Sequence, residues 1–145
     1  GFICTFNDLV TKNKTGKALM SLPENAKVMA PIELNNEKED LLLAITKAGR
    51  MLLFPVSDLP QLSKGKGNKI INITGAQAAS GEDLLVWLMV IPPRASITLY
   101  FGKRKLKFKS EDLQKYRAER GRKGTSLPRG LHNIERIDVD SVDTE

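Results

Sequence analysis

The chain contains many short apolar segments and few long ones, a pattern typical of β-structure. The clearest alternation runs from Lys103 to Lys109, where apolar or arginine side chains share one face and four lysines share the other. This alternation predicts a half-buried strand with one cationic side in water. Other apolar runs predict strands at 18–22, 28–34, 41–46, 70–73, 84–91, 97–101 and 125–131. Helical periodicity is weak, so we expect only short helical turns, within 75–83 and 111–120.

One order of features occurs three times, with a period of about fifty residues. Each unit has a glycine turn, a short strand, a corner that ends in Asp-Leu and a loop rich in basic residues and glycine. The corner aspartates are Asp8, Asp58 and Asp112, at spacings of 50 and 54 residues. Asp side chains accept hydrogen bonds from nearby backbone N–H groups, which stabilises tight turns. Since one such repeat cannot bury its apolar face alone, the pattern predicts an all-β fold of stacked, propeller-like blades.

Basic residues gather in the first basic loop (residues 12–17), the second (63–69) and the third (117–124). Together with Lys115, these loops hold eleven of the 23 basic residues and a single acid, Glu119. Because the loops recur at one place in the repeat, we expect stacking to bring them to one edge. Glycine lets a backbone approach a phosphate closely, and no aromatic residue lies inside the loops to stack on bases.

The loops therefore predict sequence-independent contact with the backbone of duplex DNA. The candidate DNA-binding residues are Lys12, Lys14, Lys17, Lys64, Lys66, Lys69, Arg117, Arg120, Arg122 and Lys123.

Net charge alone leaves the partner open. The formal charge of +6 and a pI near 9.5 favour a polyanion, which could be nucleic acid, anionic lipid or an acidic protein. A single cysteine excludes an internal disulfide, and one cysteine with one histidine cannot supply the usual ligands of a zinc site. No apolar run approaches the roughly 20 residues that span a bilayer, and no signal-peptide pattern is present. The first residues already have a strand pattern and no start Met, so we expect the chain to begin inside a larger polypeptide.

No catalytic or metal-binding residue is predicted. Tyr100 and Tyr116 have no neighbouring histidine or metal cluster that would make either a nucleophile. The acidic positions within 37–40 are typical of a solvated turn. Cys4 and Trp87 lie in apolar runs and are interpreted as core residues.

Residues 49–73, with the motif LPQLSKGKG at 59–67, resemble the C-terminal domains of the ParC family, the A subunits of topoisomerase IV. Similar motifs occur at 2–10, 16–19, 22–26 and 121–125, so the resemblance covers nearly the whole chain. It implies a β-pinwheel, a propeller-like disc of usually five blades related to that of gyrase. Residues 1–137 would then form two to three blades, followed by an acidic, flexible tail at 138–145.

The resemblance also implies a function. A ParC pinwheel binds and bends duplex DNA through its perimeter loops and helps select the transported segment for decatenation and supercoil relaxation. The parent enzyme would be an ATP-dependent type II topoisomerase with its catalytic residues upstream, so we expect no cofactor on this chain. Mg²⁺ would act in the parent enzyme, and ATP would bind the partner protein ParE. Implied partners are duplex DNA, the upstream domains of ParC and ParE in a heterotetramer, and the condensin MukB.

The implied location is the bacterial cytoplasm, on the chromosome, with peripheral association at the inner membrane as a further expectation. Two other functions remain open from the sequence: a protein-interaction module that contacts MukB, and an RNA-binding β-repeat domain. The acidic tail could in addition fold back onto the basic loops and compete with DNA.

Overall fold

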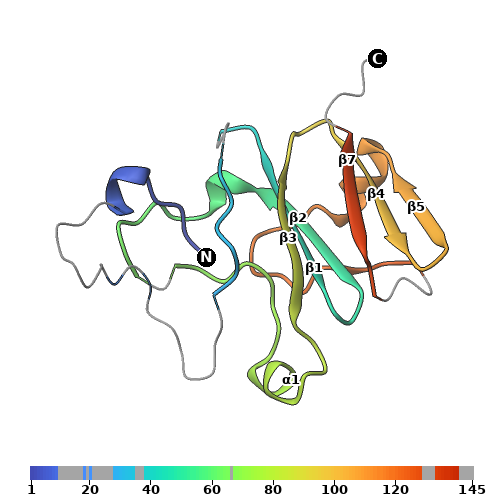
Figure 1. Ribbon diagram of the computed structural model, residues 1–145, viewed down its shortest axis with the longest axis horizontal. Helices are drawn as coiled ribbons and strands as arrows, with labels where there is room; N and C mark the ends of the chain where they lie inside the picture. Colours follow the sequence, from blue (N-terminus) through green and yellow to red (C-terminus); the bar gives the residue numbers. More distant parts are fainter. Residues whose placement is uncertain are drawn as a thin grey trace.

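The structure, a computed structural model, describes residues 1–9, 18, 20, 28–34, 38–65, 67–128 and 133–140. Its strands form two antiparallel sheets, of four strands in the order β3-β1-β2-β6 and of three strands in the order β5-β4-β7 (Figure 1). Their bounds are β1 (Leu41–Thr46), β2 (Arg50–Pro55), β3 (Leu85–Ile91), β4 (Ser96–Phe101), β5 (Arg104–Phe108), β6 (Thr125–Ser126) and β7 (Arg136–Asp140). This architecture confirms the predicted all-β, propeller-like fold class.

Two equivalent hairpins begin the second and third units. β1 pairs with β2 and β4 pairs with β5, both antiparallel. Gly49 and Gly102 lie in the two turns at positive φ, 86° and 60°, where a side chain would be strained. The glycine turns predicted from the repeat are therefore confirmed in both units.

The Asp-Leu corners form one helical turn in each unit. These turns are the 3-10 helices η1 (Phe6–Leu9) and η2 (Val56–Asp58), and the α-helix α2 (Ser110–Leu113) continued by the 3-10 helix η3 (Gln114–Tyr116). Asp8 accepts from the Thr5 N–H at 2.9 Å, and Asp112 accepts from the Lys109 N–H at 3.0 Å. The second unit has Pro55 at the equivalent position, which has no N–H to donate.

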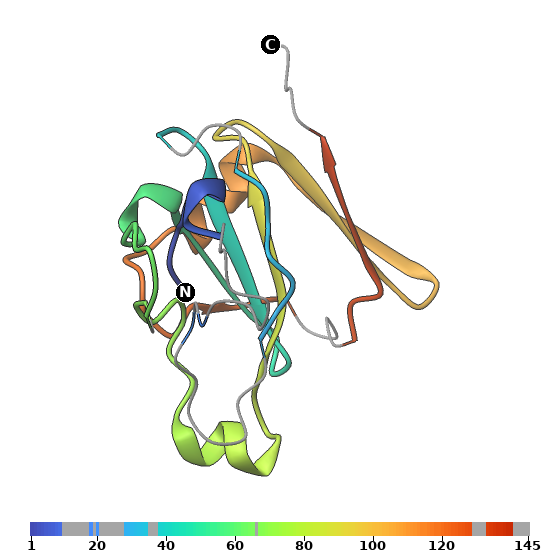
Figure 2. The ribbon, with the colours of Figure 1, turned by 60° about the vertical axis from the view of Figure 1, so that its left-hand side comes forward.

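The four-stranded sheet is buried on both faces. One core lies between the two sheets and includes Leu43, Leu53 and Leu99, and a second core on the opposite face includes Leu42 and Phe54. All six residues of β1 are buried as a result. Figure 2 shows the same order in space, with the N-terminal residues on one side of this sheet and the β4–β5 hairpin on the other.

Two strand predictions were wrong. Residues 28–34 have no strand pairing, and Val28, Met29 and Ile32 are exposed. Residues 70–73 form no strand because their backbone groups bond to the irregular third basic loop. The prediction at 18–22 falls largely outside the described residues.

The strands predicted at 41–46, 84–91 and 97–101 are present as β1, β3 and β4. The strand predicted at 125–131 is limited to β6 (Thr125–Ser126), and the strand pattern of the first residues gives only an isolated bridge at Ile3. The helical turn expected within 75–83 is α1 (Gly75–Ser80), where Thr74 and Gln77 form a reciprocal capping box. β7 continues to Asp140, beyond the domain boundary expected at residue 137. No helix in the described part of the chain is long and apolar enough to cross a membrane.

Candidate nucleic-acid interface

The second and third basic loops each lie on the outer edge of the preceding unit, and the first lies outside the described residues. Gln61 and Leu62 directly precede the second basic loop. Gln61 forms a β-bridge with Ile3, and the Leu62 N–H donates to the Ile3 carbonyl at 2.7 Å. One unit later, Arg117 bridges to Leu53, and the Ala118 N–H donates to the Leu53 carbonyl at 3.1 Å. Ile3 and Leu53 are fifty residues apart, so the same contact recurs at equivalent positions of the repeat.

The second and third basic loops are joined to each other. Gly121 N–H donates to the Ile70 carbonyl and Asn72 N–H donates to the Arg122 carbonyl, each at 2.9 Å. The Arg120 Nη1 donates to the Lys69 carbonyl at 2.7 Å. Three bonds therefore hold the end of the second basic loop beside the third.

The six described candidate residues differ in exposure and in contacts. Lys64, Lys69, Arg117, Arg122 and Lys123 are exposed. Arg120 is half-buried because its guanidinium donates to the neighbouring loop. The other four candidates, Lys12, Lys14, Lys17 and Lys66, lie outside the described residues. The joined cluster therefore consists of Lys69, Arg120, Arg122 and Lys123.

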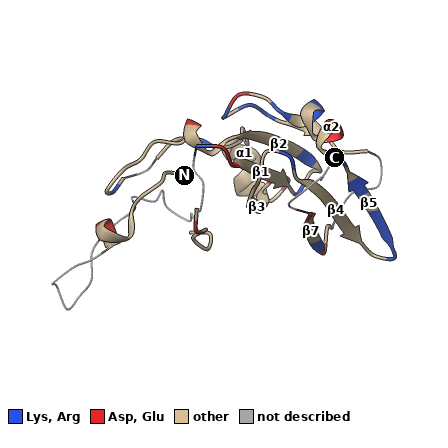
Figure 3. Cartoon of the chain, turned by 90° about the horizontal axis from the view of Figure 1, so that it is seen from above, with Lys and Arg blue, Asp and Glu red and all other residues tan. Residues whose placement is uncertain are grey.

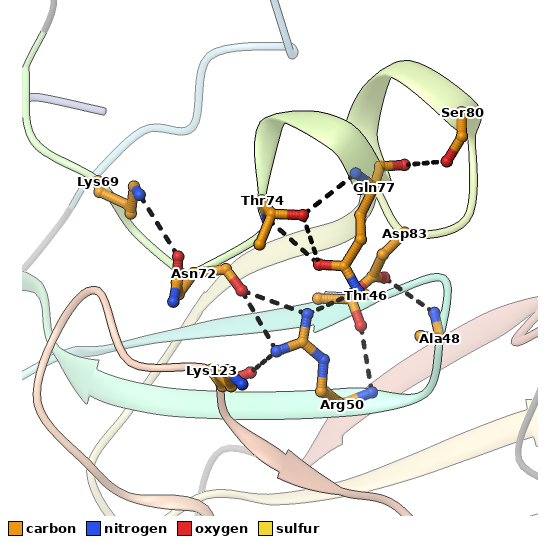
Figure 4. Close-up of polar contacts among 10 residues, drawn as sticks. All are labelled: Thr46, Ala48, Arg50, Lys69, Asn72, Thr74, Gln77, Ser80, Asp83 and Lys123. Atoms are coloured by element: carbon orange, nitrogen blue, oxygen red, sulfur yellow. Dashed lines mark hydrogen bonds and ion pairs between the residues drawn. The ribbon is translucent and has the colours of Figure 1, made fainter.

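A buried ion pair lies directly behind this cluster (Figure 4). Arg50, the first residue of β2, donates from Nη1 to the carbonyls of Lys123 at 2.6 Å and Asn72 at 3.3 Å. Its Nη2 pairs with the Asp83 carboxylate. Asp83 is 1% exposed and also accepts from the Ala48 N–H at 3.0 Å. One guanidinium thus contacts the third basic loop, the segment that follows the second basic loop and the segment that leads into β3.

The electrostatics of Asp83 reflect two opposing effects. Burial raises the pKa of its carboxyl, but the hydrogen bonds from Arg50, Ala48 and Thr46 outweigh burial and leave the pKa below its ordinary value. Asp83 is therefore charged at neutral pH and keeps Arg50 paired. Sequence analysis did not single out Arg50 as a functional residue, since its partners lie 22, 33 and 73 positions away in the chain.

The third basic loop packs tightly on β2. Gly124 has φ of 84°, and a Cβ atom placed there would lie 2.9 Å from the Met51 carbonyl oxygen. Only glycine fits this backbone conformation without strain at so close an approach. Gly124 is therefore required by the close packing of the third basic loop on β2.

Comparison with known proteins decides the family. Residues 1–35 and 40–92, more than half of the chain, match the family described as DNA gyrase C-terminal domain, beta-propeller. The chain belongs to this family.

Within the gyrase C-terminal domain family, the chain is similar to the A subunits of DNA topoisomerase 4. It is 62% identical over 141 residues to the protein of Escherichia coli (strain K12), covering 97% of this chain and 18% of that protein. It is 61% identical over 136 residues to the Haemophilus influenzae protein, covering 93% of this chain and 18% of the relative. The solved structure of the E. coli ParC C-terminal domain superposes with a TM-score of 0.90 at 60% identity, over 98% of this chain and 57% of that one. The chain thus spans under a fifth of the curated relatives and over half of the solved domain.

The sheet order also shows where the lysines of β5 lie. The sheet order places β5 at one edge of its sheet, and Figure 3 shows basic residues along this strand. The third basic loop likewise lies at the outer edge of β2. Lys105 and Lys107 are exposed and lie on the face opposite the core, confirming the predicted alternation. Asp138 and Asp140 of β7 lie on this face too, and Lys107 approaches Asp140 at 3.9 Å. Asp140 offsets part of the lysine charge on this face, and Asp138 pairs with Arg136 at 3.3 Å.

The two tyrosines of this gyrase-type domain pack against other side chains. Tyr116 is buried edge-on against Phe108, with ring centroids 5.6 Å apart, and burial followed by the charge of Asp112 raises its pKa. Arg136 lies 4.1 Å above the ring of Tyr100.

Within the described residues, no group of His, Cys, Asp and Glu side chains could hold a metal ion. Trp87 is only partly buried, and its indole N–H donates to the Ile134 carbonyl at 3.3 Å.

Proposed function

We propose that this chain is a duplex-DNA-binding domain of a ParC protein, the A subunit of topoisomerase IV. The observation that carries the proposal is the joining of the second and third basic loops on one outer edge by three hydrogen bonds. Similarity to the E. coli topoisomerase 4 protein over 97% of the chain supports the same function.

The joined loops suit phosphate binding better than base recognition. Their exposed cations come from irregular backbone rather than from a helix that could enter a groove. Tyr116, the aromatic side chain beside the third loop, is 8% exposed and packs in the core, so it offers no surface for base stacking. Contacts with phosphates position a protein on DNA without reading its sequence. The binding proposed here is therefore independent of sequence and sensitive to salt.

In the parent enzyme, this domain would hold a DNA segment for passage in decatenation and supercoil relaxation. Cleavage with Mg²⁺ would belong to the upstream domains of ParC, and ATP hydrolysis to ParE in a heterotetramer. We propose a bacterial cytoplasmic location on the chromosome, with peripheral association at the inner membrane, and MukB as a second partner at the same surface.

A competition series tests the proposal. The 145-residue chain is titrated with labelled linear duplex, and supercoiled DNA and structured RNA of matched nucleotide concentration compete. We expect both DNAs to compete and supercoiled DNA to compete best, because the perimeter proposed for a ParC pinwheel bends duplex DNA. RNA that competes best would indicate the RNA-binding alternative. Absence of duplex binding at about 50 mM salt, where phosphate contacts are strong, would reject the proposal and favour a protein-interaction module.

A further inference from the structure

The Arg50–Asp83 pair is engaged within the protein itself. The Arg50 side chain is 16% exposed and its Nη atoms donate to three acceptors, the Asn72 and Lys123 carbonyls and the Asp83 carboxylate. Figure 4 shows the guanidinium between these acceptors, which come from separate segments of the chain. Because both Nη atoms already donate to groups of the protein, a basic residue in this setting serves to position those groups.

The acceptors of Arg50 mark the ends of both basic loops. Asn72 follows the second loop and Lys123 belongs to the third, and their carbonyl oxygens lie within hydrogen-bonding distance of the same Nη1 atom. One planar group thereby limits how far the two loops can separate. Asp83 anchors the guanidinium from behind and ties it to the β1–β2 turn through the Ala48 N–H.

We propose that Arg50, held by Asp83, is a positioning residue that sets the spacing of the second and third basic loops, so that their cations meet duplex phosphates together. This inference rests on the proposed function. Arg50 has a second link to the turn, since its own N–H donates to the Thr46 Oγ1 at 3.2 Å. The loops are thus fixed to the rigid core of the β1–β2 hairpin.

The charge-conserving variant Arg50→Lys tests the proposal. A lysine ammonium keeps the charge but cannot present the planar fork that reaches three acceptors. We expect weaker duplex binding and a shallower slope of log K against log salt, by about one to two units of slope, as one or two phosphate contacts are lost. At about 0.1 M salt this corresponds to a loss of about 8-fold to 60-fold in affinity. Arg94→Lys, at an exposed position in the turn between β3 and β4, is the matched control and should keep wild-type affinity and slope.

Amide hydrogen exchange separates a local effect from loss of the fold. In Arg50→Lys the amides of Gly121 and Asn72, which join the loops, should exchange faster, while the Leu43 amide in β1 should exchange as in the wild type. Asp83→Asn provides a second variant, in which Arg50 keeps its carbonyl acceptors but loses its charged partner. It should give the same changes to a smaller extent.

The outcomes distinguish the inference from the function beneath it. A wild-type chain that does not bind duplex rejects the proposed function and the inference with it. Wild-type binding together with unchanged affinity and slope in folded Arg50→Lys or Asp83→Asn overturns the inference alone. Global unfolding of both variants also overturns it, because the pair would then support the whole domain rather than the loop spacing.

Discussion

Neutralising the joined loops should remove a calculable part of DNA affinity. The perturbation is the triple variant Lys69→Gln, Arg122→Gln and Lys123→Gln, which changes three exposed cations of the cluster. Arg120 is left intact because its guanidinium joins the two loops at 2.7 Å, and its loss would confuse charge with geometry.

The magnitude follows from counterion release. Each phosphate neutralised on B-DNA contributes about −0.9 to the slope of log K against log salt, so three lost contacts should make the slope shallower by about 2.7. With about 1 M salt as the reference where this contribution vanishes, affinity at about 0.1 M should fall about 500-fold. Glu119, 3.2 Å from Arg122, lowers this figure only slightly, since ion pairs between exposed side chains are weak.

The assay is fluorescence anisotropy with a labelled duplex between about 50 and 300 mM salt, the range in which phosphate contacts dominate the salt response. A matched control carries the same charge change at Lys38, Lys47 and Arg94, which are exposed and lie outside the basic loops. The control should lose far less affinity and keep its slope within about one unit, because only nonlocal charge has changed. Equal losses in the two triple variants would refute the reasoning, since net charge rather than the joined loops would then determine binding.

Three further outcomes are expected. Asp83→Asn should make the free energy of unfolding less dependent on pH in the acid range. The folded pKa of Asp83 lies below the unfolded value of 3.8, so the wild-type carboxylate stabilises the fold above that pH and loses this contribution as the pH falls toward the folded pKa. Denaturant titrations from about pH 2.5 to 6 would measure the difference. Gly124→Ala should destabilise the domain by at least about 1 kcal/mol in the same titrations, from positive φ and the contact with the Met51 carbonyl, whereas an unchanged midpoint would mean that the third loop shifts freely. Lys105→Gln with Lys107→Gln should change the salt slope by less than about one unit, because Asp138 and Asp140 share their face; a change near two would place β5 in the DNA contact.

Strands and turns were predictable where local pattern and pairing agree. The alternation in β5, the apolar run of β1 and the glycine turn at Gly49 each specify their structure within a few residues. The run at 28–34 is also rich in apolar residues but pairs with no strand among the described residues, so β-propensity alone misled the prediction. The run at 70–73 does bury Ile71, yet its backbone is bonded to the third basic loop.

The candidate site was predictable in location but only partly in detail. Lysines spaced at one place in a repeat predicted that basic loops would share an edge, because repeats place equivalent residues at equivalent positions. The different role of Arg120 could not be predicted, since its acceptor is a backbone carbonyl 51 residues away. The role of Arg50 could not be predicted for the same reason, because its hydrogen-bond partners come from segments that meet only in the folded chain.

The third basic loop covers the edge of β2, and this role explains why its cations are available to a ligand. The backbone of β2 would present an open edge if residues 117–126 did not bond to it, and open edges invite pairing with other chains. Covering that edge forces the loop to lie on the outside of the sheet, where its cations face solvent. The same step carries the second loop to the outer edge of the first unit and the third loop to that of the second, as the equivalent contacts of Ile3 and Leu53 show. A cationic perimeter therefore follows from the way in which the repeat covers its strand edges. Arg50 fixes the third basic loop to the β1–β2 hairpin, so the same hydrogen bonds affect both the stability of the domain and the geometry of ligand binding.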